Sequence, residues 1–388
     1  MSFLVWKSFH WWHWTALLLA FGYGYIMLRY WWHWRKLKTW ERPKSFFAHT
    51  TVSVIIPARN EAANIIPCVQ SIIRQHYPQA LLEIIVVDDF STDGTARQVE
   101  RIKNPNVFLC SLADFPPANG DTAFKKRAIE IGIARATGEL IITTDADCIA
   151  NEYWIPTIVS LYEQEKAVCI AAPVLFYDGT NTIERFQALD FVGMMAITGA
   201  GISGRFQTMA NGANLAYQRK AFYEVGGFGG IDKVASGDDI LLAQKFAKQY
   251  PGRVKFAKSK EAVVYTAAKP NWNEFLAQRI RWGSKSTSYR EWQVPLMLLT
   301  VFLFCMVLLF GFVAIFSNPI WRSVWYVMLF TKVFADYILL FSACRFFGKI
   351  SWLRHYWTSL FIHTIYIAVV GIESNISKKY QWKGRTVK

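Results

Sequence analysis

The sequence predicts an α/β nucleotide-binding domain with membrane helices before and after it. Three features indicate this class: apolar runs that end in pairs of aspartates, helix-like segments between those runs, and long charge-free segments towards both ends of the chain. Alternation of strands and helices is typical of a parallel sheet. At 388 residues the chain is long enough for a domain of about 200 to 250 residues and a further part.

The composition is that of a basic membrane protein. The formal net charge is +15, 53% of the residues are hydrophobic and 17 are tryptophan. A nucleic-acid-binding protein could share this charge, but the sequence has no Cys/His finger spacing and no dense basic stripe with interleaved aromatic residues. We therefore expect a membrane partner and no nucleic-acid partner. The six cysteines form no CxxC pair, which favours reduced thiols over a disulfide framework.

Residues 8–28 are expected to cross a membrane. They include no Asp, Glu, Lys or Arg, and about 20 apolar residues span a bilayer. A signal peptide is the alternative, but bulky Trp31 and Trp32 follow in place of a small-residue cleavage site. Six basic residues follow between positions 29 and 44, against Lys7 alone before the segment. The positive-inside rule therefore places the next region in the cytoplasm.

The cytoplasmic region opens with two strand patterns and a helix pattern between them. TVSVIIPARNEAANI, residues 51–65, is an apolar strand that breaks at Pro57 and leads into a helix. EIIVVDDFSTDGT, residues 83–95, is a second strand, which ends at Asp88 and Asp89. Strand, helix and strand in this order predict a parallel βαβ unit with a right-handed crossover.

A third strand pattern, GELIITTDADC at residues 138–148, ends in Asp145 and Asp147. Its apolar run predicts a buried parallel strand, and ligands of open α/β sheets bind at the carboxyl ends of such strands. Two carboxylates one residue apart could hold Mg²⁺ or Mn²⁺ on a substrate diphosphate. For an isolated DxD the alternative is a solvated turn. With Asp88 and Asp89 on the same edge, we expect a nucleotide-sized cleft.

Three later segments add candidate side chains. Lys125 begins a helix-like stretch, residues 125–138, whose basic start could hold phosphates or could be a solvated face. The small residues of NGANLAY, residues 211–217, allow a backbone to approach a ligand closely. Asp238 and Asp239 open another helix pattern, where they could be caps favoured by the helix dipole or could supply a general base.

NEFLAQRIRWGSKS, residues 273–286, predicts an amphipathic basic helix just before the next membrane segment. Gln278, Arg281 and Trp282 share a face of this helix or adjoin it. The arginines could be snorkelling anchors at the membrane interface. Alternatively, Arg281 could stabilise a departing diphosphate while Trp282 forms a wall of the acceptor site.

PARNE, VDDFSTDGT, TTDADC, GANLAY, SGDD and QRIRW, in this order and at these separations, resemble the motifs of membrane-bound members of glycosyltransferase family 2. The resemblance covers roughly residues 52–282. It implies a GT-A fold and an inverting transferase that uses a nucleotide sugar, with UDP as the expected nucleotide, and Mg²⁺ or Mn²⁺. The expected fold class is thus α/β, a GT-A (Rossmann-like nucleotide-sugar-binding) cytoplasmic domain with one N-terminal and two to three C-terminal transmembrane helices.

The resemblance also implies roles for individual residues. Asp145 and Asp147 match the metal and diphosphate DxD, Asp239 with Asp238 beside it matches the catalytic base, and Phe124 stands where the family has glycine before its lysine. Asp239 would take the proton of an acceptor hydroxyl as its oxygen attacks the anomeric carbon. QxxRW is matched by Gln278, Arg281 and Trp282. The implied donor and nucleotide set is Pro57, Arg59, Asn60, Glu61, Asp88, Asp89, Lys125 and Asp145.

Three apolar segments follow, residues 294–321, 321–344 and 355–372. Lys332 and Asp336 in the middle one favour a within-helix pair, although intramembrane charges are functional candidates by default. Three crossings would put the basic tail outside, against the positive-inside rule, so one segment is expected to be re-entrant or interfacial. WKGR, residues 382–385, resembles a terminal motif that faces the active site in hyaluronan synthase-like proteins.

The predicted organisation has five parts. They are an N-terminal anchor with a basic juxtamembrane segment (1–46), a GT-A domain (47–270), an interfacial helix with QxxRW (271–293), a C-terminal membrane region (294–374) and a basic tail (375–388).

Two functional classes fit these features. The favoured one is an enzyme that glycosylates a lipid or lipid-linked acceptor at the cytoplasmic face of a bacterial inner (plasma) membrane. The chain has few membrane segments, and these would be too few to line a polymer channel. The second is a processive polysaccharide synthase, which QxxRW permits. A non-catalytic membrane scaffold or a nucleic-acid-binding protein fits less well, because all three acidic motifs are intact. The sugar, the acceptor and the oligomeric state are not identified by the sequence.

Overall fold

The computed structural model describes residues 10–115, 124–231, 237–285, 289, 291–316, 318–376, 380–382 and 385–387. The chain forms two compact units. The membrane unit comprises Met1–Lys36, Asp178–Ala200 and Lys269–Lys378, and the sheet unit comprises Leu37–Tyr177, Gly201–Ala268 and Lys379–Lys388. The segment Asp178–Ala200 therefore groups with the membrane helices, whereas the sequence boundaries placed it inside the 47–270 domain.

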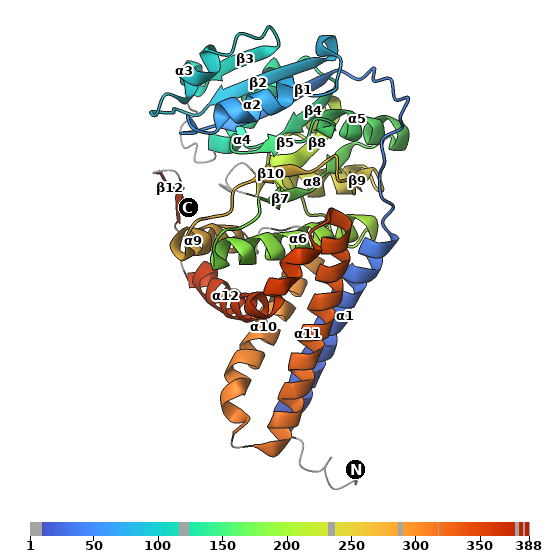
Figure 1. Ribbon diagram of the computed structural model, residues 1–388, viewed down its shortest axis with the longest axis vertical. Coiled ribbons are helices and arrows are strands. Elements are labelled where there is room, and N and C mark those ends of the chain that lie inside the picture. Colours follow the sequence, from blue (N-terminus) through green and yellow to red (C-terminus); the bar gives the residue numbers. More distant parts are fainter. Residues whose placement is uncertain are drawn as a thin grey trace. The chain divides into compact units, whose positions relative to one another are not determined.

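The sheet unit is built on a seven-stranded sheet in the order β3-β2-β1-β4-β8-β6-β9 (Figure 1). Strands β1 to β4 run parallel, and β8 runs antiparallel to both β4 and β6. Every residue of β4 is buried, as the sequence predicts for a central strand. The strand bounds are β1 Val52–Ala58, β2 Leu82–Asp88, β3 Val107–Ser111, β4 Leu140–Thr143, β6 Cys169–Ala171, β8 Leu215–Gln218 and β9 Val254–Phe256.

The prediction that the first strand breaks at Pro57 is wrong, because β1 continues through Pro57 to Ala58. Pairing with β4 reaches only Ile55, opposite Thr143, so beyond that point β1 is paired on one side alone by β2. Proline lacks an N–H group and is tolerated in a strand where no ladder bond is required of it. Ala58 pairs with Asp88, and the carboxyl ends of β1 and β2 therefore lie side by side.

Helices surround this sheet, and a small second sheet in the order β5-β10-β7 accompanies it (Figure 1). A Cβ on Gly132 of α4 would lie 2.6 Å from Ile55 Cγ2 of β1, so glycine lets α4 lie directly on the sheet. The bounds are α2 Ile65–Ile73, α3 Thr95–Glu100, α4 Phe124–Arg135, α5 Trp154–Glu165, α7 Arg219–Glu224, α8 Asp238–Gln249, β5 Ile149–Ala150, β7 Val174–Phe176 and β10 Val264–Thr266. Two tail strands, β11 Tyr380–Trp382 and β12 Arg385–Val387, pair with each other; the centre of WKGR lies outside the described residues.

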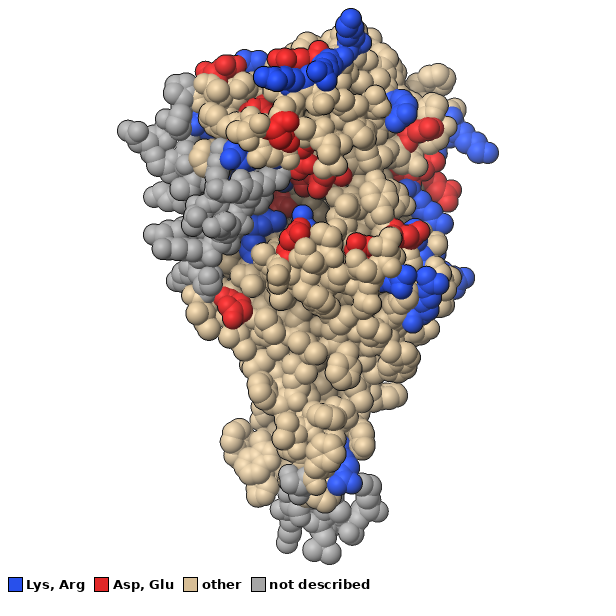
Figure 2. All heavy atoms as spheres, turned by 60° about the vertical axis from the view of Figure 1, so that its left-hand side comes forward, with Lys and Arg blue, Asp and Glu red and all other residues tan. Residues whose placement is uncertain are grey.

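In the described part of the chain, four helical segments are long and apolar enough to cross a membrane. They are Thr182–Ser203 (α6), Gln293–Ala314 (α10), Pro319–Phe347 (α11) and Ile350–Ile376, which joins the short helix η6 (Ile350–His355) to α12 (Tyr356–Ile376). The sequence analysis did not single out α6. Figure 2 shows a long surface of the membrane helices almost without Lys, Arg, Asp or Glu among the described residues.

The N-terminal helix α1, Trp11–Lys36, is not among these four because its many Trp, Tyr and His residues lower its mean hydropathy. It runs parallel to α11 within the membrane unit: the His13 ring lies 5.7 Å from the Trp321 ring, and the Trp34 ring lies 5.5 Å from the Phe346 ring. A helix that accompanies α11 from end to end crosses the membrane wherever α11 does. We retain the prediction of an N-terminal span on this ground.

Helix α12 ends beside α9, Trp272–Gly283, the helix that precedes α10. A Cβ on Gly283 would lie 3.1 Å from Ser374, and a Cβ on Gly371 would lie 2.2 Å from the Phe302 ring of α10. The chain therefore returns within the membrane unit to the region where α10 begins. The expectation that one C-terminal segment is re-entrant or interfacial stays a prediction.

Candidate active site

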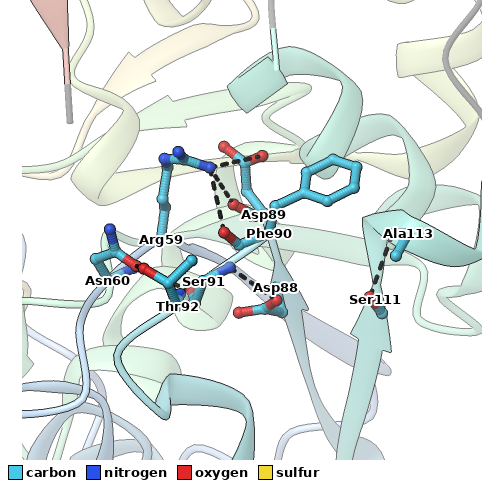
Figure 3. Close-up of polar contacts among 9 residues, drawn as sticks. All are labelled: Arg59, Asn60, Asp88, Asp89, Phe90, Ser91, Thr92, Ser111 and Ala113. Atoms are coloured by element: carbon cyan, nitrogen blue, oxygen red, sulfur yellow. Dashed lines mark hydrogen bonds and ion pairs between the residues drawn. The ribbon is translucent and has the colours of Figure 1, made fainter. Parts of the chain in front are cut away.

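The loops that follow β1 and β2 are joined by hydrogen bonds (Figure 3). Arg59 Nη1 donates to the Asp89 carbonyl oxygen at 2.7 Å and lies 3.9 Å from the Asp89 carboxylate. Asn60 Oδ1 accepts the Thr92 N–H at 2.9 Å, and the Asn60 N–H donates to Ser91 Oγ at 3.0 Å. The side chains of Arg59 and Asn60 thus hold the two loops together.

Asp88 and Asp89 are almost fully buried, at 6% and 2% exposure. Asp88 Oδ2 accepts the Ser91 N–H at 3.2 Å, whereas Asp88 Oδ1 is buried with no hydrogen-bond partner in the described part of the chain. A buried acceptor left unsatisfied costs about 1–3 kcal/mol. A donor group that reached this oxygen would remove that cost.

The sequence analysis missed Phe90, which lies beside these aspartates. Its φ is +52°, as is that of Asn60, and a non-glycine residue in this region costs about 1–2 kcal/mol. Such strain gathers at functional sites. The Phe90 ring is 39% exposed and offers an aromatic face next to a buried acceptor; nothing in the local sequence pattern indicates this backbone conformation.

Four residues from distant segments of the sheet unit converge in what we call the Lys125 cluster: Lys125, Asp145, Gly212 and Asp239. Lys125 Nζ donates to Asp145 Oδ1 at 2.7 Å, and the Gly212 N–H donates to Asp239 Oδ2 at 2.8 Å. A Cβ on Gly212 would lie 3.6 Å from Asp239 Oδ2 and 3.7 Å from Lys125 Nζ. The ammonium of Lys125 and the carboxylate of Asp239 therefore both lie against Gly212.

The electrostatics of this cluster favour a charged lysine and a basic aspartate. Burial raises the pKa of the Asp239 carboxyl and the adjacent Asp238 carboxylate raises it further, against the opposing effect of Lys125. Burial by itself lowers the pKa of Lys125, but the carboxylates of Asp145, Asp238 and Asp239 outweigh it, so the pKa lies above its ordinary value. A carboxylate with a raised pKa is a better proton acceptor at neutral pH.

Local structure explains how these side chains are placed. Asp145 follows the end of β4, Lys125 lies in the first turn of α4, and Asp239 lies in the first turn of α8. Lys126, the neighbour of Lys125, is buried and donates to the Ile231 carbonyl oxygen, which holds the start of α4. Lys125, which precedes Lys126, bonds to the strand-end Asp145.

Asp145 and Asp147 are the predicted ligands of a divalent cation. Among the described residues no group of three or more His, Cys, Asp and Glu side chains could hold a metal by itself. Mg²⁺, however, is commonly bound through one or two carboxylates together with substrate phosphates and water. Both aspartates are partly exposed, so the residues fit a cation that binds together with a diphosphate.

Gln278, Arg281 and Trp282 lie on α9 of the membrane unit. Gln278 Oε1 is buried without a hydrogen-bond partner among the described residues. The centre of the Trp282 ring lies 6.2 Å from the centre of the Phe191 ring of α6. The Arg279 guanidinium stacks over Trp282, with Cζ 4.6 Å from the centre of the Trp282 ring. Because these residues and the Lys125 cluster belong to different units, their joint action stays a prediction.

A buried ion pair behind Trp282 was missed by the sequence analysis. Arg279 Nη2 of α9 lies 2.8 Å from Asp190 Oδ2 of α6, and the two side chains are 4% and 7% exposed. The Tyr366 hydroxyl donates to Asp190 Oδ1 at 3.3 Å. The signal for this pair is the position of Asp190 in the middle of an apolar helix, where a charge requires a partner.

Asp190→Ala is expected to lower the free energy of unfolding by about 3–5 kcal/mol, because it leaves the Arg279 charge buried and unpaired. Unfolding in mild detergent measures the loss. Glu165→Ala is the matched control: its carboxylate lies 3.0 Å from Lys255 Nζ, but both side chains are partly exposed, so about 0–1 kcal/mol is expected. Equal losses for the two variants would contradict the structural role given to the buried pair.

The sheet unit is a nucleotide-binding type of α/β domain with carboxylates at the carboxyl ends of its strands. Residues 53–226 match the family model described as glycosyl transferase family 2, and residues 140–372 match that of glycosyl transferase family group 2. The second match covers more than half of the chain. The chain therefore belongs to glycosyltransferase family 2, which confirms the family and the enzyme class inferred from the motifs.

Curated relatives include "Probable glycosyltransferase YdaM" of Bacillus subtilis, 27% identical over 235 residues, or 60% of this chain and 54% of the relative. "4,4'-diaponeurosporenoate glycosyltransferase" of Staphylococcus aureus is 29% identical over 188 residues, 47% of each chain. The chain spans about half the length of these relatives. A solved mannosyltransferase of Pyrobaculum calidifontis, in complex with GDP-Man and Mn²⁺, has a TM-score of 0.55 at 20% identity. The match covers 93% of this chain and 98% of the mannosyltransferase chain. At that identity the likeness concerns the fold alone, and it confirms the predicted GT-A class.

Proposed function

We propose that this protein is an inverting glycosyltransferase that moves a sugar from a nucleoside diphosphate sugar, with UDP as the expected nucleotide, to a hydroxyl of a lipid or lipid-linked acceptor. The observation that carries the proposal is the Lys125 cluster. It brings the Lys125 ammonium group and Asp239, an aspartate of raised pKa, against Gly212, and it ties the strand-end Asp145 to that ammonium group. These are a phosphate-binding group, a metal ligand and a general base.

The nucleoside would bind at the loops after β1 and β2. Asp88 Oδ1, buried and without a partner in the described structure, would accept a hydrogen bond from an N–H of the base or a hydroxyl of the ribose. The exposed ring of Phe90 would stack on the base, an interaction worth about 1–3 kcal/mol. Arg59 and Asn60 hold these loops together, and Pro57, Glu61 and Asp89 complete the expected nucleotide-binding set.

The diphosphate would lie beside Lys125 and the two aspartates after β4. Asp147 and Asp145 would hold the cation, which neutralises phosphate charge as the leaving group departs. The positive charge of Lys125 adds to this stabilisation, and its bond to Asp145 keeps its ammonium at the site. We expect the guanidinium group of Arg281, on α9, to add a further positive charge.

Asp239 would act on the acceptor. As its carboxylate removes the hydroxyl proton, the acceptor oxygen forms a bond to the anomeric carbon, and the bond between that carbon and the diphosphate oxygen breaks. The electron pair leaves with the nucleoside diphosphate. A single displacement of this kind inverts the anomeric configuration and needs no covalent intermediate with the enzyme.

The acceptor class follows from the membrane unit. Its helices are long and apolar enough to cross a bilayer, which supports a lipid acceptor, and the name of the Staphylococcus aureus relative gives 4,4'-diaponeurosporenoate as the compound that is glycosylated. Trp282, with Gln278 beside it on α9, would form the apolar wall of the acceptor site. We place the sheet unit on the cytoplasmic side of a bacterial plasma membrane, from the basic residues that follow α1.

The test is incubation of the full chain in nanodiscs with a panel of labelled nucleotide sugars and membrane lipids, followed by sizing of the product. One sugar added to a lipid is the expected result. A long polymer would support the processive synthase instead. No transfer from any donor, in a preparation that still binds nucleotides, would contradict the proposed reaction.

Asp147→Asn is expected to abolish transfer and to weaken nucleotide binding, because one of the two cation ligands is lost. Calorimetric titration with the nucleoside diphosphate, with and without Mn²⁺, measures the binding, and excess chelator should silence the wild type. Asp114→Asn, which changes an exposed carboxylate after β3, is the control. Full wild-type activity in excess chelator would rule out the metal assignment.

A further inference from the structure

The membrane unit contains a pocket of about 150 Å³ that the transfer reaction does not use. Its walls come from the start of α6, from Asp178 and Gly179 shortly before that helix, and from η6 between α11 and α12. A single water needs on the order of 10–15 Å³, so there is room for a tetrahedral oxyanion. The polar side chains that line the pocket are Asp178, Arg185, Ser351, Trp352, Arg354 and His355.

The positive charge of this pocket is not neutralised by its one carboxylate. Asp178 Oδ1 already accepts hydrogen bonds from Lys349 Nζ at 2.9 Å and from Trp352 Nε1 at 2.8 Å. Asp178 also interacts electrostatically with Arg354, but neither Arg354 nor Arg185 forms an ion pair within 4 Å among the described residues, so one carboxylate serves Lys349 and both arginines.

Both arginines are oriented through Nε. Arg185 Nε donates to the Gly179 carbonyl oxygen at 3.2 Å, and Arg354 Nε donates to His355 Nε2 at 2.9 Å. In the described structure these bonds leave the terminal amino groups of both guanidinium ions available to a ligand. Planar guanidinium groups bind phosphate oxygens through paired hydrogen bonds, and the Ser351 hydroxyl adds another donor.

The surroundings of the pocket indicate where such a phosphate would come from. Three large apolar residues near the lining residues in the sequence are exposed. Their exposed fractions are 50% for Ile350, 66% for Trp357 and 72% for Phe361. The pocket also adjoins the end of α11, a helix long and apolar enough to span the membrane. A basic pocket beside apolar surface at the end of a membrane helix suits a lipid whose phosphate enters the pocket while its acyl chains cover the apolar side chains.

We propose that this pocket binds the phosphate of an anionic membrane phospholipid. The inference does not depend on the transfer reaction, because the bound lipid is neither donor nor product and can be measured without turnover.

The experiment is native mass spectrometry of the full chain extracted from nanodiscs of phosphatidylcholine that contain phosphatidylglycerol. Arg185→Gln with Arg354→Gln should retain about tenfold less phosphatidylglycerol than the wild type, because charge-assisted hydrogen bonds are lost. Arg322→Gln, which changes a basic residue in the first turn of α11, at the end away from η6, is the matched control and should retain wild-type amounts. His355→Gln alone, which keeps both guanidinium groups, should fold and lose less lipid than the double variant.

Each outcome decides the proposal. Equal retention by the double variant and the control, or loss in both, would overturn it. A second arm adds millimolar inorganic phosphate: if phosphate protects Arg354 from modification by phenylglyoxal while the lipid does not, the pocket takes a free phosphate and the lipid assignment fails. Protection by the lipid, together with selective loss in the double variant, is the expected result.

Discussion

Replacement of Asp239 by asparagine is expected to lower turnover by a factor of about 10² to 10⁴, the range of general-base catalysis. The carboxylate that accepts the Gly212 N–H would no longer take the proton of the acceptor hydroxyl. The amide keeps an oxygen for the Gly212 bond, so the loop should stay in place. Donor affinity should therefore change little, and the loss should appear in kcat rather than in the KM for the nucleotide sugar.

The pH profile gives an independent readout of the same group. Because burial and Asp238 raise the pKa of Asp239, the base is ionised only above a pH higher than the usual value of about 3.9 for aspartate. Activity should fall as the pH decreases through this raised pKa. Asp238→Asn removes the neighbouring negative charge, so the acid limb of the profile should move to lower pH. Unchanged turnover in Asp239→Asn would assign the base elsewhere, with Asp238 as the first candidate.

The second large effect is expected from Arg281→Lys, which should lower turnover by about 10- to 100-fold. Lysine keeps the charge and a long apolar stem, so a residue that only anchors α9 at the membrane should tolerate it. A guanidinium group that binds a leaving diphosphate through two hydrogen bonds should not, because lysine is a point charge without the planar fork. The loss corresponds to charge-assisted hydrogen bonds worth about 1.5–3 kcal/mol.

The measurement is sugar transfer in nanodiscs, normalised to folded protein. Trp282→Ala should show a similar loss, with an increase in the KM for the acceptor. Arg345→Lys, the same change at an exposed position near the end of α11, is the control for general effects on the membrane interface. Wild-type turnover of Arg281→Lys would show that α9 is only an anchor, and it would leave the catalytic role of QxxRW in this chain without support.

Features that depend on neighbouring residues could be predicted from the sequence. The apolar run before Asp145 predicts the buried strand β4, because a strand covered on both faces needs apolar side chains at every position. The charge-free stretches predict the membrane helices for the same reason, since the bilayer excludes charge. The strand break at Pro57 was predicted wrongly because the residue pattern of β1 cannot show where its neighbour β4 ends. Pairing with β4 stops at Thr143, so Pro57 is not required to donate a hydrogen bond to a second neighbouring strand.

The relations that define the site were decided by tertiary structure. Lys125 and Asp239 are 114 positions apart in the sequence, and only the folded sheet unit brings both against Gly212. Asp190 and Arg279 neutralise each other because α6 and α9 pack together. The residue periodicity of either helix does not predict this pairing. The sequence by itself therefore determined the family, the α/β class and the apolar segments near both ends of the chain, which follow from local periodicity and motif spacing, but not the apolar helix α6. The raised pKa of Asp239, the unsatisfied oxygen of Asp88 and the basic pocket at η6 depend on burial and on contacts between distant segments, and only the tertiary structure decided them.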